Sequence, residues 1–103
     1  MATRLLSVPA VSVLHAVASG VPYGFQIIEE TGLTSGTVYT SLGRLERDGY
    51  VTSRWEDART AHHQKRPPRR YYAITVSGER VLHDSIQRFR ALRPVRGAAA
   101  GRS

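Results

Sequence analysis

The chain has 103 residues, enough for one domain with a modest hydrophobic core and too few for two. Apolar residues make up 41% of it, and no apolar run is long enough for a transmembrane helix, so a membrane partner is not expected. The absence of cysteine excludes disulfides, thiolate zinc sites and cysteine nucleophiles, and fits a cytoplasmic protein.

The charge is positive and unevenly distributed. Fifteen basic residues against eight acidic ones give a formal net charge of +7, and all but one of the basic residues are arginine. Residues 59–70 and 88–102 are rich in basic residues and contain no acid. Localised positive charge favours a polyanion such as nucleic acid, because arginine forms forked contacts with phosphate and guanine. The alternative is a solvated basic surface without a specific partner.

The N-terminal part predicts a flexible arm followed by a helix. Residues 1–6 form the arm, and Pro9 after its short apolar patch argues against a signal peptide. Ser7 is a suitable N-cap for a helix with Pro9 in its first turn, and Gly20 marks the end of that helix. Its apolar stripe consists of Val11, Leu14 and Val17.

Two further helices separated by a short turn are expected next. The second covers residues 23–31, with Gly32 as its C-terminal stop, and the third begins after an N-cap at Thr34 or Ser35. Such a short, glycine-containing connection is typical of a helix-turn-helix. The apolar side of the second helix is Phe25, Ile27 and Ile28, and the core face of the third is Val38, Leu42 and Leu45.

A β-hairpin with a long loop follows. Residues 50–56 and 70–75 have strand patterns, and Trp55 is interpreted as a packing residue where the first strand ends. Residues 57–69, read as DARTAHHQKRPPR, are polar, basic and broken by two prolines, so they predict a loop, the wing of a winged helix. His62 and His63 lack a nearby third ligand, so no metal and no cofactor are expected.

The C-terminal part predicts one more helix and a tail. Ser77 is expected to cap a helix over residues 77–93, and Pro94 to stop it; residues 94–103 form a disordered basic tail. The predicted fold is therefore mainly α with a small β-hairpin. It consists of a winged helix-turn-helix over residues 7–76 and a C-terminal dimerisation helix.

Four blocks in the chain carry a family resemblance: YGFQIIEETG, SGTVYTSLGRLERDGYVTSRWE, RRYYAIT and SGERVL. In this order they resemble the PadR family of bacterial transcriptional regulators, over residues 8–92. The resemblance implies a homodimeric winged-helix repressor that binds a near-palindromic operator and is released by a small aromatic or cationic effector. Compared with that family, the wing is longer and more basic, and the last helix is short and lacks tryptophan.

The third helix is expected to enter the major groove of double-stranded DNA. Ser35 and Thr37 are assigned to phosphates, and Thr40 and Arg44 to base edges. Tyr39 either places its hydroxyl on a phosphate or is a half-buried core aromatic. For Arg44 and Arg47 the alternative to DNA contact is a solvated helix face with local acidic partners. The basic residues assigned to DNA in the wing are Arg59, Lys65, Arg66, Arg69 and Arg70; the alternative there is a disordered, solvated loop.

A dimer interface is expected along the first and last helices. The residues assigned to it are Val11, Leu14, Leu82, Ile86, Phe89 and Leu92. An effector would lie where these helices meet across the dimer. The competing hypothesis is a winged-helix protein–protein interaction module that does not recognise a DNA sequence. An enzyme is disfavoured, since no nucleophile, base and orienting acid occur together, and single-stranded RNA binding is disfavoured because the aromatic residues occupy core-forming positions.

Overall fold

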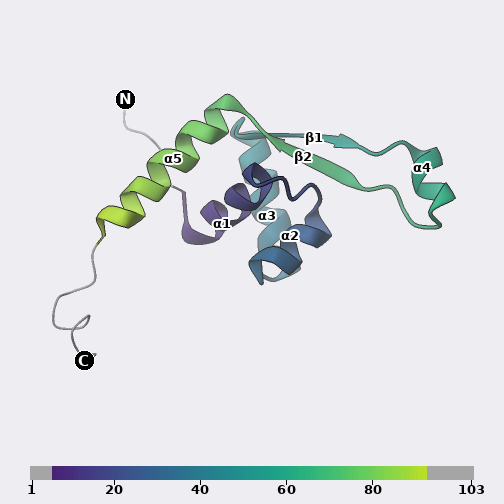
Figure 1. The fold of residues 1–103 in the computed structure, drawn as a ribbon, viewed down its shortest axis with the longest axis horizontal. Helices are drawn as coiled ribbons and strands as arrows, with labels where there is room; N and C mark the ends of the chain where they lie inside the picture. The colour runs from purple at the N-terminus through teal and green to yellow at the C-terminus, as the bar shows by residue number, and fades with distance from the viewer. Residues whose placement is uncertain (1–5, 93–103) are drawn as a thin grey trace.

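The structure, a computed structural model, describes residues 6–92 (Figure 1). The predicted arm (residues 1–6) and tail (residues 94–103) lie outside the described residues, except for Leu6. Within them the elements are α1 (Val8–Ala18), α2 (Gly24–Thr31), α3 (Ser35–Arg47), β1 (Val51–Trp55), α4 (Ala58–His63), β2 (Arg70–Ile74) and α5 (Val76–Ala91). The predicted mainly helical fold with a small β-hairpin is confirmed. None of the described helices combines the length and apolarity needed to cross a membrane.

Helix α1 begins and ends near the predicted signals. The Ser7 hydroxyl accepts a hydrogen bond from the Ala10 N–H at 3.3 Å, and Pro9 lies in the first turn, where its missing N–H costs little. The chain leaves the helix through Gly20, whose φ of 93° lies in the left-handed region. Leu6, expected in the flexible arm, instead packs against the core.

Helices α2 and α3 form the helix-turn-helix. Gly32, with a φ of 72°, ends α2, and Thr34 caps α3 because its hydroxyl accepts a hydrogen bond from the Thr37 N–H at 3.2 Å. Ser35 is therefore the first helical residue and not the cap. Phe25 does not belong to the apolar side of α2, since 62% of its surface is exposed.

The hairpin projects away from the helical body (Figure 1). Strands β1 and β2 pair antiparallel, from Val51 opposite Ile74 to Trp55 opposite Arg70. Between the strands the prediction of a loop is wrong for one segment, which forms α4. Asp57 caps this helix by accepting a hydrogen bond from the Arg59 N–H at 2.8 Å, and Ala61 is buried.

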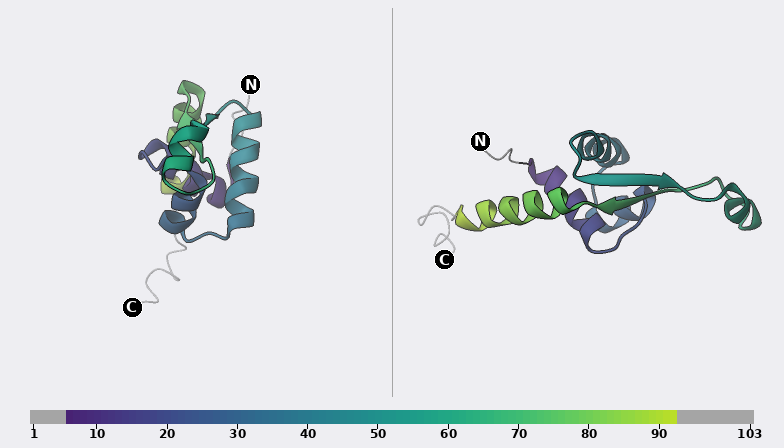
Figure 2. Two further views of the ribbon diagram at one scale, coloured as in Figure 1. Left: turned by 90° about the vertical axis from the view of Figure 1, so that its right-hand side faces the viewer. Right: turned by 90° about the horizontal axis from the view of Figure 1, so that it is seen from above.

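Helix α5 starts earlier than predicted. Its cap is Thr75 and not Ser77, because the Thr75 hydroxyl accepts from the Gly78 N–H at 3.0 Å and donates to the Gly49 carbonyl at 2.7 Å. Gly78 lies so close to the Tyr50 carbonyl that a Cβ atom would clash with it. The helix ends at Ala91, whereas residue 93 was expected. The two views in Figure 1 and Figure 2 agree that α5 and the hairpin leave the body in opposite directions.

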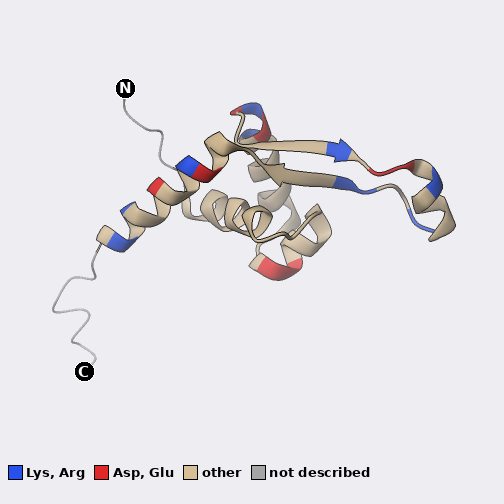
Figure 3. Cartoon of the chain, turned by 45° about the horizontal axis from the view of Figure 1, so that its top comes forward, with Lys and Arg blue, Asp and Glu red and all other residues tan. Residues whose placement is uncertain are grey.

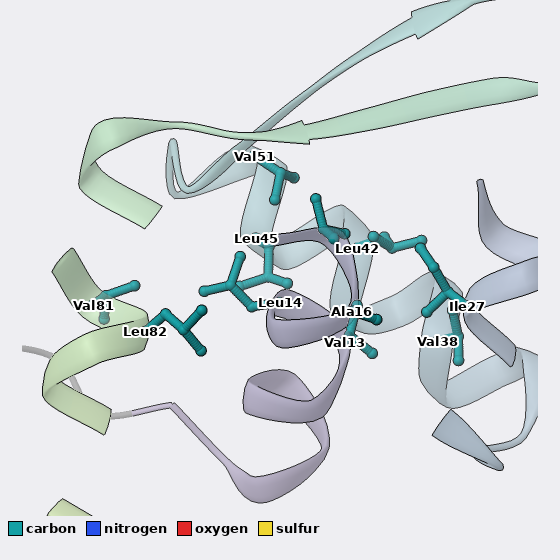
Figure 4. Close-up of a cluster of buried hydrophobic side chains, with 11 residues drawn as sticks. Val13, Leu14, Ala16, Ile27, Val38, Leu42, Leu45, Val51, Val81 and Leu82 are labelled. Carbon is teal, nitrogen blue, oxygen red and sulfur yellow. The ribbon is translucent and has the colours of Figure 1, made fainter. Parts of the chain in front are cut away.

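The core lies around α1, which contacts α2, α3 and α5, under the hairpin (Figure 4). It includes the apolar faces predicted for α1 and α3, and Val51 at the start of β1. Leu14 is completely buried in it, and Leu82 is 8% exposed. Leu14 therefore has no surface left for a partner, and its assignment to a dimer interface is wrong.

Candidate nucleic-acid interface

Helix α3 presents a polar outer face. Its apolar residues all turn toward the core, so the others point outward or sideways. Five of the residues predicted to contact DNA are exposed: Ser35, Tyr39, Thr40, Arg44 and Arg47. The sixth, Thr37, is partly buried, and its hydroxyl accepts a hydrogen bond from the Thr34 hydroxyl at 3.0 Å. Thr37 thus belongs to the cap as well as to the surface.

Two glycines on the same outer face were not predicted to matter. Gly36 and Gly43 are seven residues apart, which is about two helical turns. A Cβ atom at either position would meet nothing within 4 Å, so packing inside the chain does not require glycine there. Glycine on a helix surface allows another backbone to approach closely.

Tyr39 lies on the side of α3 that faces the start of α2. A Cβ atom at Gly24 would lie 2.5 Å from Cε1 and 2.6 Å from the hydroxyl oxygen of Tyr39, so Gly24 makes room for this ring. The ring is held against α2, yet 52% of the residue is exposed. About half of Tyr39 is therefore buried, as in the alternative interpretation, and the other half is accessible to a partner.

The two arginines of α3 are available for an external partner. Arg44 is exposed, and no acidic side chain within residues 6–92 pairs with it. Arg47 approaches Asp48 only at 3.7 Å, with 68% of its side chain exposed. Glu46, which would be a local partner of these arginines in the alternative interpretation, instead pairs with Arg70 of β2.

The near end of the wing is held by an ion pair. Arg66 Nη1 and Nη2 lie 2.6 Å and 2.7 Å from the two carboxylate oxygens of Glu56, whose side chain is 8% exposed. The remaining guanidinium N–H groups donate to Gln64 and to the Pro67 carbonyl. All five donors of Arg66 are thus directed at acceptors in its own chain. Its assignment to a phosphate is wrong, because it has no free donor to offer.

The Glu56 carboxylate accepts two further hydrogen bonds, and together these contacts explain its low pKa. The Arg69 N–H donates to Glu56 at 3.1 Å, and the Tyr71 hydroxyl donates at 3.4 Å. The Arg66 hydrogen bonds, helped by the Arg69 N–H, lower the pKa of Glu56 from 4.5 to about 2 despite its partial burial. The same pair raises the pKa of Arg66. We call the Glu56–Arg66 pair the wing brace.

Three other arginines of the hairpin stack on aromatic rings. Arg69 lies 4.1 Å from the Tyr23 ring centroid and Arg70 lies 5.5 Å from that of Trp55. Arg70 also donates to Ser53 at 2.9 Å and lies 3.3 Å from Glu46, so it links the hairpin to α3. Arg54, which the sequence prediction omitted, lies over Tyr71 at 5.2 Å.

The tip of the wing carries unpaired charge. Arg59 and Lys65 are exposed, and neither pairs with an acidic side chain among the described residues. Figure 3 shows basic residues gathered along the outer hairpin and α4, whereas the acidic residues of α2 lie on the helical body. The tip is thus partly helical and cationic. No three His, Cys, Asp or Glu side chains of residues 6–92 are grouped as a metal site would require.

A groove of about 670 Å³ lies between the starts of α2 and α3 and the hairpin. Trp55 lines it with 63% of its surface exposed, so the interpretation of Trp55 as a packing residue is wrong. Its hydrophobicity suggested burial, but its position at the end of β1 leaves most of the side chain exposed, with only Arg70 stacked on the ring. The other aromatic and basic residues of this aromatic groove are Tyr23, Phe25, Tyr39, Arg66, Arg69, Arg70 and Tyr72.

A second hollow, of about 510 Å³, lies between α1, α2 and α5. It contains Val11 and Ile86, two of the residues predicted for a dimer interface. Phe89, farther along α5, is partly exposed, and Leu92, just after the end of this helix, is 68% exposed. These four residues retain accessible apolar surface, whereas Leu82, also predicted for the interface, is a buried core residue like Leu14.

Comparison with known proteins agrees with this geometry. A PadR family transcription regulator from Clostridium difficile R20291 superposes with a TM-score of 0.70 at 21% identity, covering 82% of this chain and 88% of that one. One from Eggerthella lenta DSM 2243 has a TM-score of 0.65 at 26% identity, covering 80% and 71%. Among curated proteins none matches closely enough to count as a relative. The sequence profile of the transcriptional regulator PadR-like family matches residues 13–84, so the chain belongs to this family of DNA-binding transcriptional regulators.

Proposed function

We propose that the protein is a dimeric, sequence-specific repressor that acts on DNA in the cytoplasm and binds a near-palindromic operator. The observation that carries this proposal is the exposed outer face of α3, where Thr40, Arg44 and Arg47 are uncovered beside a cationic wing. A surface with free arginines and small side chains suits the major groove, which admits one helix.

Each part of α3 has its own task. The helix start and Ser35 donate to phosphate, because N–H groups of the first turn have no partner in the helix. In this proposal Arg44 reads guanine O6 and N7, and Thr40 contacts a neighbouring base edge. Tyr39, held by Gly24, offers its hydroxyl to the phosphate backbone. Phosphate contacts fix the orientation of the helix, and base contacts give the preference for sequence.

The wing contributes sequence-independent affinity. Arg59 and Lys65 at its tip are free to neutralise phosphates or enter the minor groove. Arg69 and Arg70 keep part of their surface beside the aromatic groove. Arg66 takes no direct part, since it holds the wing in place.

Dimerisation would place two copies of α3 on successive half-sites, about one helical turn of DNA apart. The accessible residues Val11, Ile86, Phe89 and Leu92 supply an apolar surface on α1 and α5. A small aromatic or cationic effector would bind in the hollow between α1, α2 and α5, next to this surface. Binding there would favour a dimer geometry that does not fit the operator.

The decisive experiment is selection of bound duplexes from a random library by the purified full chain. We expect enrichment of a palindromic motif with two half-sites. Arg44→Ala should lose the preference at one position in each half-site, and Arg80→Ala, an exposed arginine on α5, serves as the matched control. No enrichment, together with retained binding to a protein partner, would replace the repressor with an interaction module.

A further inference from the structure

The exposed aromatic residues of this chain are gathered in one place. Six large hydrophobic residues are highly exposed among residues 6–92, and three of them are aromatic: Phe25, Tyr39 and Trp55. All three line the aromatic groove, although they come from α2, α3 and β1. Exposure of large rings costs free energy in water, so their convergence indicates a surface that is covered in the working complex.

The groove also carries positive charge at its edges. Arg69 lies over Tyr23 and Arg70 over Trp55, and each is therefore held on a ring at the groove. Arg66 is neutralised by Glu56, and Arg70 is partly compensated by Glu46, whereas no acidic side chain of the described residues pairs with the Arg69 guanidinium. An apolar floor with a cationic margin fits a partner that has both apolar surface and negative charge.

The position of the groove identifies that partner. It lies between α3, the proposed major-groove element, and the hairpin, which leads to the proposed minor-groove element. In a duplex the major and minor grooves are separated by one sugar–phosphate backbone. When both elements bind DNA, this backbone must pass through the space between them.

We propose that the aromatic groove seats the sugar–phosphate backbone of one DNA strand. Deoxyribose rings pack against Trp55 and Phe25, and the flanking phosphates are bound by the Arg69 guanidinium and the Tyr39 hydroxyl. This inference rests on the proposed DNA-binding function and extends it from the bases and the wing tip to a third contact.

Such a contact has its own thermodynamic signature. Phosphate neutralisation releases counterions and makes affinity depend on salt, with a slope of about 0.9 per phosphate. Packing of a sugar on an aromatic ring releases apolar hydration water and no counterions. The groove floor therefore contributes affinity that depends on neither the base sequence nor the salt concentration.

Trp55 permits a direct test because it is the only tryptophan of the chain. Its fluorescence reports on the groove alone. We expect addition of the selected operator duplex, and of a scrambled duplex of equal length, to change the emission of the full-length protein. Emission unchanged by bound duplex would overturn the proposal. Unchanged emission with DNA, but saturable quenching by sodium benzoate, would instead assign the groove to a small aromatic anion.

Variants of Trp55 and Arg69 separate the contribution of the aromatic surface of the groove from that of the basic residues at its edge. Trp55→Ala should weaken binding to both duplexes by the same factor, about tenfold, with an unchanged salt slope. Trp55→Phe should restore most of that loss. Arg69→Gln should lower the salt slope by about 0.9. Thermal melts of each variant identify any loss caused by unfolding.

The outcomes keep this inference distinct from the proposed function. If Trp55→Ala and wild type bind both duplexes equally while Arg44→Ala impairs operator binding, the groove proposal fails and the repressor remains. If wild type itself selects no duplex, the proposed function fails with it.

Discussion

Helix α3 and the wing both carry arginines, but they use them differently. On α3, Arg44 and Arg47 are exposed and have at most a loose local partner. In the wing, Arg66 is saturated by acceptors of its own chain, and Arg70 bonds to Ser53 and Glu46. A local excess of basic residues therefore overstates the number of contacts available to DNA. Some basic residues of the wing stabilise its conformation through contacts within the chain. Those at its tip and at the edge of the aromatic groove remain available to DNA.

The largest expected effect is on α3. Arg44→Ala should weaken operator binding by about 1–3 kcal/mol, because a guanidinium directed at a base edge contributes that much discrimination. Fluorescence anisotropy with the selected operator measures the loss, with Arg80→Ala as the control. Equal affinities for Arg44→Ala and Arg80→Ala would show that α3 does not read bases through Arg44.

The tip of the wing should show the next effect, and it should depend on salt. Replacing Arg59 and Lys65 together by glutamine should lower the slope of log affinity against log salt by about 1.8, since two phosphates lose their partners. The change should be the same for operator and scrambled duplexes. A loss restricted to the operator would mean that the tip reads sequence.

Substitution in the wing brace should weaken DNA binding without changing its dependence on salt. Arg66→Met removes a charge but no phosphate contact, so the salt slope should stay at the wild-type value while the affinity for all duplexes falls. The reason is that the wing loses its fixed direction. A slope reduced by about 0.9 would return Arg66 to the set of DNA-binding residues.

Protonation of Glu56 at low pH should break its ion pair with Arg66. The pKa of Glu56 is lowered from 4.5 to about 2, so its ionised form stabilises the fold fully above about pH 4.5. This stabilisation is lost as the pH falls toward 2. NMR should show the Arg69 amide signal, whose N–H donates to Glu56, shifting with a midpoint near pH 2. Glu56→Gln should lack this transition, and a midpoint near 4.5 would contradict the ion pair.

The smallest effect is expected at Gly43 on α3. Gly43→Ala should stabilise the free protein by about 0.8–1.0 kcal/mol, because alanine favours a helix and the added Cβ meets nothing. On the proposed DNA-facing surface the same methyl group should reduce operator affinity. Thermal melts and anisotropy measure the two effects, and a gain in both would place Gly43 outside the interface.

Much of the fold is encoded locally and was predictable. Ser7 and the glycines at 20 and 32 mark helix ends, and apolar residues at helical spacing identify the buried faces of α1 and α3. Helix α4 escaped prediction because Ala61 is its only buried residue, so it has no apolar period. Its one signal was Asp57 as an N-cap before alanines.

The candidate site was less predictable, because its contacts connect distant positions. Glu56 and Arg66 are ten residues apart, and only the fold of the wing brings them together. Trp55 and Phe25 looked like core residues by type, whereas strand and helix orientation leaves them exposed. The outward position of the polar residues on α3 followed from helical periodicity alone.

The junction at Thr75 has a mechanical consequence. Its hydroxyl donates to the Gly49 carbonyl, its N–H donates to the Tyr50 carbonyl at 3.0 Å, and Gly78 closes onto the same carbonyl. The residues directly after α3 are thus hydrogen-bonded to the N-cap of α5, and no flexible linker separates the two helices. In the proposed dimer α5 would act as a lever arm, so a small tilt at the subunit contact would displace α3 along the DNA. The distance between the two half-sites would then be tuned by the angle between the α5 helices.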